Sequence, residues 1–318
     1  MFPARYFPVR YFPVRYFLSG GGVGSVSTTG YFYKYKTNIY VSTSDNSGAD
    51  ATNTVQIAVR DFSFNQQSLS VLVSRETLDP TQSRDVKPYV TALLPVEFSF
   101  STYISPLLDT NVTSPEENLW IGLMGSDSLT SDSSSSEIDF ADGNVQTLQN
   151  LTLWFEQTDQ NEGNYRIDNA IIDSATINFS INEHATIEWR GRALAITSDN
   201  SMPAATERLD HENCLKNKFS TVDLDGNTSL ALSGGAITFN NNNTFYGRSR
   251  LGKTTQPVGS YTGNRVISGE LEFHMRAGNT SVIDLFNQIR ISAKTIQHEL
   301  NPQQITISIG GDVAPSRS

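Results

Sequence analysis

The sequence has 318 residues and carries 33 Asp and Glu against 23 Lys and Arg, which gives a formal net charge of −10. An acidic chain gains no counterion-release energy from DNA, so this composition argues against a protein that grips nucleic acid, although such a chain could surround DNA without binding it. Cys214 is the single cysteine, which excludes an intrachain disulfide, and no stretch approaches the roughly 20 apolar residues that span a bilayer.

An aromatic repeat opens the chain: Phe-Pro-Ala-Arg-Tyr at 2–6 recurs at 7–11 and 12–16 with Val in place of Ala. Proline at every fifth position excludes a helix and a central strand, and the recurring arginines argue against a signal peptide. A glycine-rich hinge follows at 19–24. We therefore expect residues 1–24 to form an extended arm that docks on a neighbouring subunit, with a disordered, duplicated tail as the alternative. The docking side chains are Phe2, Tyr6, Phe7, Tyr11, Phe12, Tyr16 and Phe17.

Alternation of polar and apolar residues predicts strands at 31–36, 56–64, 69–73 and 96–103, with a polar loop at 78–88. Ser114-Pro115-Glu116-Glu117 has the form of a capping box and predicts a helix that begins at Pro115. The apolar face of this helix comprises Leu119, Trp120, Leu123 and Met124, and Gly125 can end it.

The second half of the chain repeats this order of elements. Alternation predicts strands at 151–156, within 171–187, at 270–276 and at 304–309, and a second capping box at 281–284 predicts a short helix. The buried face of that helix comprises Val282, Leu285, Phe286 and Ile289. Residues 197–262 have no counterpart in the first half and are interpreted as an insertion that contains hairpins.

Two pairs of passages resemble one another. Residues 59–78 align with 176–195, and 96–100 align with 269–273. A repeated unit usually buries its surface only with the help of neighbours, which favours assembly over solitary catalysis. The fold class predicted is therefore all-β with two short helices, built from two similar modules at 25–145 and 146–318.

Little catalytic chemistry is visible. His211-x-x-Cys214 has the spacing of metal ligands but lacks a second pair, and Asp223-x-Asp225-Gly226-Asn227 lacks the bidentate Glu of an EF-hand. There is no nucleophile elbow, phosphate loop or dinucleotide fingerprint. We therefore predict neither an enzyme nor a bound metal or cofactor.

The clearest chemical signal is a set of polar faces on the alternating strands, whose opposite faces are rich in Phe, Leu and Ile. Spacing alone favours a solvated outer sheet over the alternative, a negative wall that lines a channel. The candidate residues for such a wall are Asp61, Ser63, Glu97, Ser99, Glu270 and Glu272.

Four passages, taken in order, resemble bacteriophage tail tube proteins of the longer type with two tube-like units. They are VRDFSFNQQSLSVLVSRETL, VEFSFSTYISP, YRIDNAIIDSATINFSINEHATIEWRGRAL and NRVISGELEFHMRAGNTSVIDLFNQI. The resemblance implies that each unit is a β-sandwich or half-barrel that contributes strands to an intersubunit β-barrel. It covers about a third of the chain and leaves out the aromatic arm and residues 197–262.

The resemblance also implies a structural role in the virion. Rings of six tube-like units would stack into a channel for the genome, with three chains per ring preferred and six as the second choice. Sheath, baseplate and tape measure proteins would be partners, and DNA would pass without specific binding. Assembly would take place in the bacterial cytoplasm. The alternative is a capsid decoration or fibre-associated β-sandwich binding protein.

Overall fold

The fold is taken from a computed structural model that describes residues 37–45, 47–74, 86–104, 116–125, 129–131, 136–138, 148–157, 164–199, 201–207, 221–224, 232–246, 257–274 and 305–308. One helix, α1 (Glu117–Met124), is present in these ranges. The strands are β1 (Thr37–Ser42), β2 (Thr54–Ile57), β3 (Arg60–Ser74), β4 (Val86–Tyr103), β5 (Leu129–Ser131), β6 (Ser136–Ile138), β7 (Leu151–Gln157), β8 (Tyr165–Ser180), β9 (Thr186–Ala193), β10 (Ala195–Ser198), β11 (Thr206–Glu207), β12 (Thr221–Leu224), β13 (Leu232–Asn240), β14 (Thr244–Tyr246), β15 (Gly259–Tyr261), β16 (Val266–Phe273) and β17 (Ile305–Ser308).

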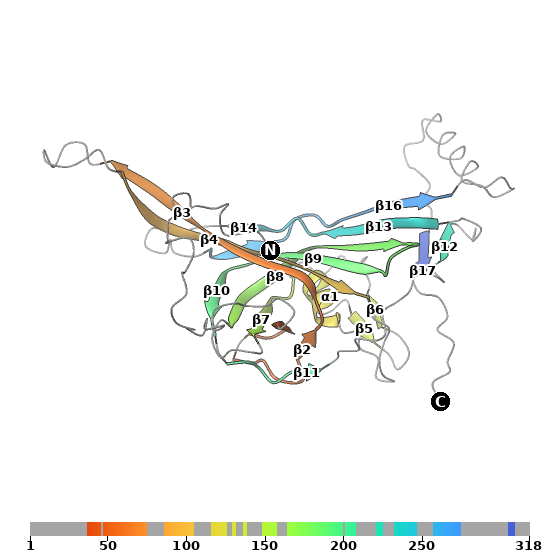
Figure 1. The fold of residues 1–318 in the computed structure, drawn as a ribbon, viewed down its shortest axis with the longest axis horizontal. Helices are drawn as coiled ribbons and strands as arrows, with labels where there is room; N and C mark the ends of the chain where they lie inside the picture. The colour runs from red at the N-terminus through yellow and green to blue at the C-terminus, as the bar shows by residue number, and fades with distance from the viewer. Residues whose placement is uncertain are drawn as a thin grey trace, which may run out of the picture.

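A single large sheet dominates the described structure, and almost all of its pairings are antiparallel (Figure 1). The strand β8 divides it into two parts. Its first half pairs with β7 and β10, while its second half, from Ile171 onward, pairs with β9 and β13. Asn169, just before this change of partners, has a φ of 52°, a left-handed conformation that Asn tolerates better than most residues. The all-β fold class predicted from the sequence is confirmed.

The hydrophobic core lies against the inner faces of both parts of the sheet. It contains Ile39 and Val41 of β1, Leu153 of β7 and Phe100 of β4, all almost fully buried. Successive residues of a strand point to opposite faces of the sheet, and β4 accordingly alternates the buried Val96, Phe98 and Phe100 with more exposed polar residues. In β7 the predicted alternation does not separate a core side from a solvent side, because Thr152 and Trp154 are buried as well as their apolar neighbours.

The helix α1 packs on the core through Leu119, Leu123 and Met124, as predicted. Its partly buried Trp120 contacts the ring of Trp189 edge-on at a centroid distance of 4.9 Å. The Nδ2 atom of Asn118 donates to the carbonyl oxygens of Val41 at 2.9 Å and Asn53 at 3.0 Å, which fastens the helix to β1 and to the residue before β2.

The predicted start of this helix was wrong. The helix begins at Glu117 and Glu116 is its N-cap residue, while the predicted cap Ser114 lies outside the described residues. The predicted end is confirmed, because Gly125 follows the last helical residue with a φ of 97°. Such a backbone conformation suits glycine because it has no Cβ.

The strands β3 and β4 form a hairpin that is much longer than predicted and extends away from the rest of the sheet (Figure 1). The predicted polar loop at 78–88 overlaps the start of β4, so its boundary was wrong. Pro88 and Pro95 lie in the part of β4 that pairs with β3 alone, since pairing with β9 starts at Val96. Proline is tolerated there because its missing N–H need not serve a second neighbour.

Residues 197–262, predicted to be an insertion with hairpins, contain β13, which is an integral strand of the large sheet between β8 and β16. The same region contains the small β14–β15 hairpin. Ile181, the last apolar residue of the alternation predicted within 171–187, is instead 67% exposed in the turn after β8.

The two similar passages have different strand patterns. The first runs along one continuous strand, β3, as far as Ser74, whereas the second contains the end of β8, a turn at 181–185 and β9. Strands from both predicted modules also share the large sheet. The division of the chain at residue 145 therefore stays a prediction. The arm at 1–24 and the second predicted helix lie outside the described residues.

Candidate functional site

The candidate site is the solvated face of a six-stranded antiparallel region with the strand order β3-β4-β9-β8-β13-β16. We call this surface the polar face. Its positions are set by register: Glu97 of β4 is level with Arg192 of β9, while the neighbouring pair, Phe98 and Gly191, points into the core. From β3 to β13, one side of each strand thus faces the core and the other side carries the polar residues, whereas β16 at the edge has no buried residue.

Small hydroxyl and amide side chains form rows across the polar face. One row runs Ser63, Ser99, Arg190, Ser174 and Asn240 from β3 to β13. The next runs Ser101, Glu188, Thr176, Thr238 and Ser268. Hydroxyl groups contact each other along these rows, at 3.1 Å between Ser63 and Ser99 and 3.1 Å between Thr176 and Thr238. The middle of the face therefore presents hydroxyl and charged side chains, and the first row continues on β16 to Val266, which is 49% exposed.

One end of the polar face is acidic. Glu270 and Glu272 of β16 are exposed and, with Glu183 and His184 in the β8–β9 turn, line an open depression of about 550 Å³. Within the part of the chain that the structure describes, no group of three or more His, Cys, Asp or Glu has the arrangement of a metal site. The acidic end is thus a concentration of solvated negative charge.

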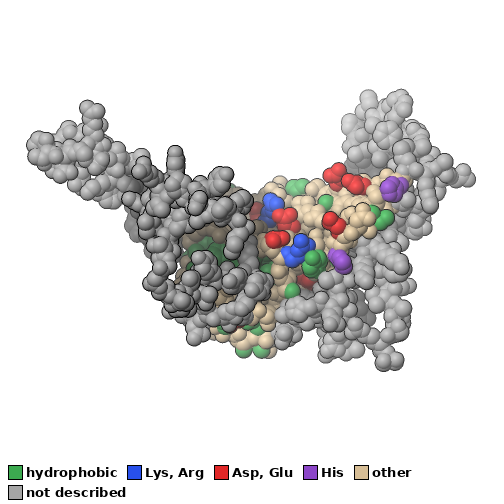
Figure 2. Space-filling view, viewed as in Figure 1, with side chains coloured by type: hydrophobic (Ala, Val, Ile, Leu, Met, Phe, Trp, Pro, Cys, Tyr) green, Lys and Arg blue, Asp and Glu red, His purple; other side chains and the backbone are tan. Residues whose placement is uncertain are grey.

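Arginines also lie on this face, and the sequence analysis did not anticipate them. Arg190 Nη2 lies 2.6 Å from Glu188 Oε1, and Arg192 Nε lies 3.7 Å from Glu97 Oε1. The guanidinium of Arg60 lies 5.1 Å from the centre of the Tyr103 ring, a cation–π distance. Figure 2 shows acidic and basic side chains adjacent to one another on the described surface. The sequence contained a signal for these arginines, because Arg190 and Arg192 alternate with Trp189 and Gly191, which are buried.

The structure places five of the six candidate wall residues on this one face. Ser63, Glu97 and Ser99 lie together where β3 meets β4, and Glu270 and Glu272 lie at the opposite edge on β16. Asp61 is exposed, but it sits in an irregularity of the β3–β4 register with a φ of 50°. The two groups are therefore separated by three intervening strands.

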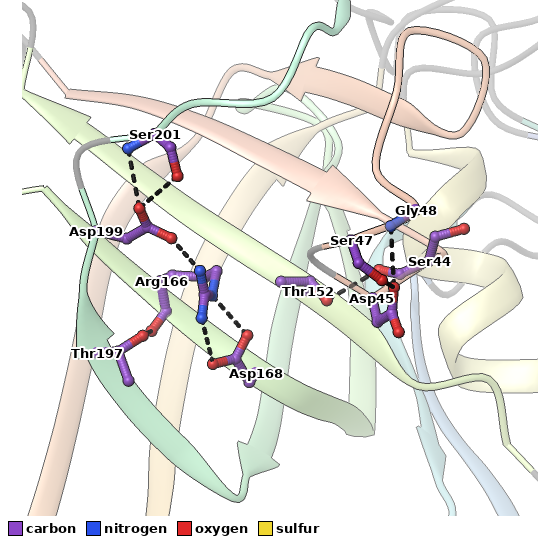
Figure 3. Close-up of polar contacts among 10 residues, drawn as sticks. All are labelled: Ser44, Asp45, Ser47, Gly48, Thr152, Arg166, Asp168, Thr197, Asp199 and Ser201. Carbon is purple, nitrogen blue, oxygen red and sulfur yellow. Dashed lines mark hydrogen bonds and ion pairs between the residues drawn. The ribbon is translucent and has the colours of Figure 1, made fainter.

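A second polar cluster lies on the other part of the sheet. The Arg166 guanidinium bonds to both Asp168 and Asp199, and Asp199 also accepts bonds from Ser201 (Figure 3). Burial opposes ionisation of Asp199, but the hydrogen bonds from Ser201 and the charge of Arg166 outweigh it and hold its pKa below the ordinary value. The hydrogen bond from Arg166 to Asp168 is the main reason that the pKa of this guanidinium is raised.

An open depression of about 440 Å³ lies beside this cluster. Across it, the Asp45 carboxylate accepts bonds from the Ser47 hydroxyl and the Gly48 N–H, and these bonds lower its pKa (Figure 3). Arg166 is thus paired with Asp168 and Asp199, while Asp45 is hydrogen-bonded within its own loop. This arrangement stabilises β10 against β8 and does not resemble a set of catalytic groups.

Several residues singled out from the sequence lie outside the described residues. They include His211, Cys214 and all the aromatic residues of the predicted arm. No helix among the described residues has the length and apolar character needed to cross a membrane.

Comparison with known proteins identifies a homologue. No protein-family model matches the chain. The chain is 27% identical over 307 residues to the tail tube protein pb6 of Escherichia phage T5. The match includes 88% of this chain but 64% of the phage T5 protein, so the chain spans less than two thirds of that relative's length. The resemblance that the sequence motifs indicated is confirmed: this chain is similar to a phage tail tube protein.

Proposed function

We propose that this protein is the structural subunit of a phage tail tube, that it has no catalytic role, and that it resides in the virion tail. The observation that carries the proposal is the continuous six-stranded sheet, of which the strands from β3 to β13 have one face on the core and one solvated polar face. A tube wall needs this combination, because its inner surface is exposed to water while its body must be packed. The similarity to the phage T5 protein supports the same role.

Ring closure would use the edges of the sheet. In the described residues, β3 pairs with β4 alone and β16 pairs with β13 alone, so each leaves one edge with unpaired backbone groups. Exposed edges invite uncontrolled pairing, and closure into a barrel removes them. We propose that β3 of one subunit approaches β16 of the next. Three chains per ring, each with two tube-like units, is the preferred count, and six chains is the second choice.

The polar face would form the channel wall. Phosphates that pass a net negative wall are repelled over about a Debye length, roughly 8 Å at physiological salt. The rows of Ser and Thr hydroxyls would limit the apolar surface on which bases could stack, and the guanidinium of Arg60 lies against the Tyr103 ring of this face. The genome would thus slide through without specific binding, and the collective field of Glu97, Glu270 and Glu272 would be repeated around each ring.

The predicted arm at 1–24 would dock between subunits, where each aromatic side chain can bury on the order of 150 Å². Sheath, baseplate and tape measure proteins are the further partners that this role implies.

Electron microscopy of the purified protein tests the role itself. Stacked rings or tubes are expected, whereas dispersed particles would instead support a capsid decoration or fibre-associated protein. Native mass spectrometry of rings then distinguishes three chains from six. A monomer that persists at high concentration would contradict both counts.

Charge reversal tests the wall. Glu97→Lys with Glu270→Lys should leave the subunit folded, because both side chains are solvated, and should slow genome passage through phosphate binding that weakens with added salt. The matched control has Gln at both positions. Both variants lose the Glu97 carboxylate that lies 3.7 Å from Arg192, so they differ only in the two added lysines, and the control should eject DNA much faster than the Lys variant. Normal ejection by the Lys variant would contradict the assignment of this face to the channel.

A further inference from the structure

Two arginines on the polar face are held by carboxylates of the same face. The side chains of Arg190 and Glu188 are 65% and 37% exposed, and those of Arg192 and Glu97 are 40% and 65% exposed. These pairs are open to solvent, so each contributes little to folding stability. Their position is more informative, since Arg190 and Arg192 lie on β9, in the interior of the six-stranded region.

An unpaired arginine at such a position would counteract a smooth wall. The guanidinium presents its donors in a planar fork that matches the oxygens of a phosphate, and a charged pair of this kind makes strong hydrogen bonds. Each phosphate that it neutralises also releases counterions, which favours binding. Two free arginines per subunit, repeated around a ring, would therefore convert the wall into a phosphate-binding surface.

We propose that Glu188 and Glu97 act as masks that keep Arg190 and Arg192 from binding the phosphates of nucleic acid. This inference rests on the proposed function, because masking matters where a polyanion passes the face. The inference gives Glu97 a second role. Besides adding negative charge to the wall, Glu97 forms an ion pair with Arg192.

The two masks differ in strength. Both Nε and Nη2 of Arg190 donate to Glu188 Oε1, at 2.9 Å and 2.6 Å, so this guanidinium is well occupied. Arg192 is held more loosely, at 3.7 Å from Glu97, and its Nη1 donates to the Asn243 carbonyl oxygen at 3.4 Å. Removal of Glu188 should consequently release more phosphate-binding capacity than removal of Glu97.

The test is binding of a fluorescently labelled duplex DNA to the purified full chain, followed by anisotropy over a range of salt concentrations. The double variant Glu97→Gln with Glu188→Gln should bind the duplex at least about tenfold more tightly at low salt than a control double variant with Glu270→Gln and Glu272→Gln. Its plot of log affinity against log salt should be steeper by about 1.8, since each of two released arginines adds about 0.9 for B-form DNA. Of the two single variants, Glu188→Gln should show the larger effect.

The matched control is Glu270→Gln with Glu272→Gln. It changes the net charge by the same amount on the same face, but both carboxylates lie on β16, away from the arginine pairs of β9. If both double variants gain affinity equally, net charge alone is responsible and the masking proposal is wrong. No gain in the Glu97 and Glu188 variant overturns it as well.

A further variant guards against indirect effects of misfolding. Adding Arg190→Gln and Arg192→Gln to the Glu97 and Glu188 variant should abolish the gain, whereas a gain that persists would show that the arginines are not its source. Masking and the proposed function fail separately. Absence of tubes by electron microscopy would refute the tail tube role, while the DNA measurement on dispersed subunits would still decide whether the arginines are masked.

Discussion

Substitution of Gly191 tests how closely β9, which carries the arginines of the polar face, packs between β4 and β8. Gly191 lies buried on β9, opposite Phe98 of β4 and next to β8. A Cβ atom at this position would lie 2.3 Å from Phe98 Cζ and 2.5 Å from the Ile171 carbonyl oxygen. The second contact is with backbone, which cannot rotate away as a side chain can, so Gly191→Ala should force β8 and β9 apart.

Overpacking of this kind typically costs about 1–3 kcal/mol, and the backbone contact places Gly191→Ala near the upper end of that range. Urea unfolding of dispersed subunits, followed by the fluorescence of the three Trp residues, measures the loss as a lower midpoint at unchanged slope. Adding Phe98→Leu should restore stability only in part, because it relieves the ring contact but not the carbonyl contact.

Gly269→Ala is the matched control. Its added Cβ would lie 3.6 Å from the nearest atom, the Ala236 carbonyl oxygen, which is ordinary van der Waals contact. Its free energy of unfolding should stay within about 0.5 kcal/mol of the unmodified protein, as is usual for exposed positions without special contacts. If Gly191→Ala unfolds at the same urea concentration as Gly269→Ala, the close packing of β9 between β4 and β8 is wrong.

Two further predictions rest on contacts in the structure, and a third rests on the sequence of the arm. Asn118→Leu removes both hydrogen bonds that join α1 to its neighbours and should lower the free energy of unfolding by about 2 kcal/mol, measured by the same urea assay; no loss would contradict the role of this amide. Because the pKa of Asp199 is lowered in the folded state, its contribution is present above its ordinary pKa of 3.8 and is lost as pH falls through the folded value. Asp199→Asn should therefore unfold more easily than the unmodified protein near neutral pH, and the difference should close in acid; a difference independent of pH would refute this. Deletion of residues 1–18 should shorten or destabilise tubes in electron micrographs while the subunit stays folded, and tubes of unchanged length and stability would count against the docked arm.

The sequence by itself determined which face of β4 and of β9 is polar. In β4, Val96, Phe98 and Phe100 alternate with Glu97, Ser99 and Ser101, and this pattern can be read from neighbouring residues alone. Successive side chains of a strand point to opposite faces of the sheet, so the two sets lie on opposite faces. The same holds for the apolar face of α1 and for its end at Gly125, where the backbone conformation favours glycine. Homology to a tail tube protein was also visible in the motifs, since patterns of buried and exposed positions are shared between relatives.

Only the tertiary structure decided which strands became neighbours. Pairing depends on contacts between residues far apart in the chain, so no local pattern predicted that β13 lies between β8 and β16, or that the second similar passage is divided by a turn. The same limit applies to charge. The carboxylates of β4 and the arginines of β9 each follow from alternation, but their opposition as Glu97 and Arg192 exists only because the register of two distant strands places them side by side.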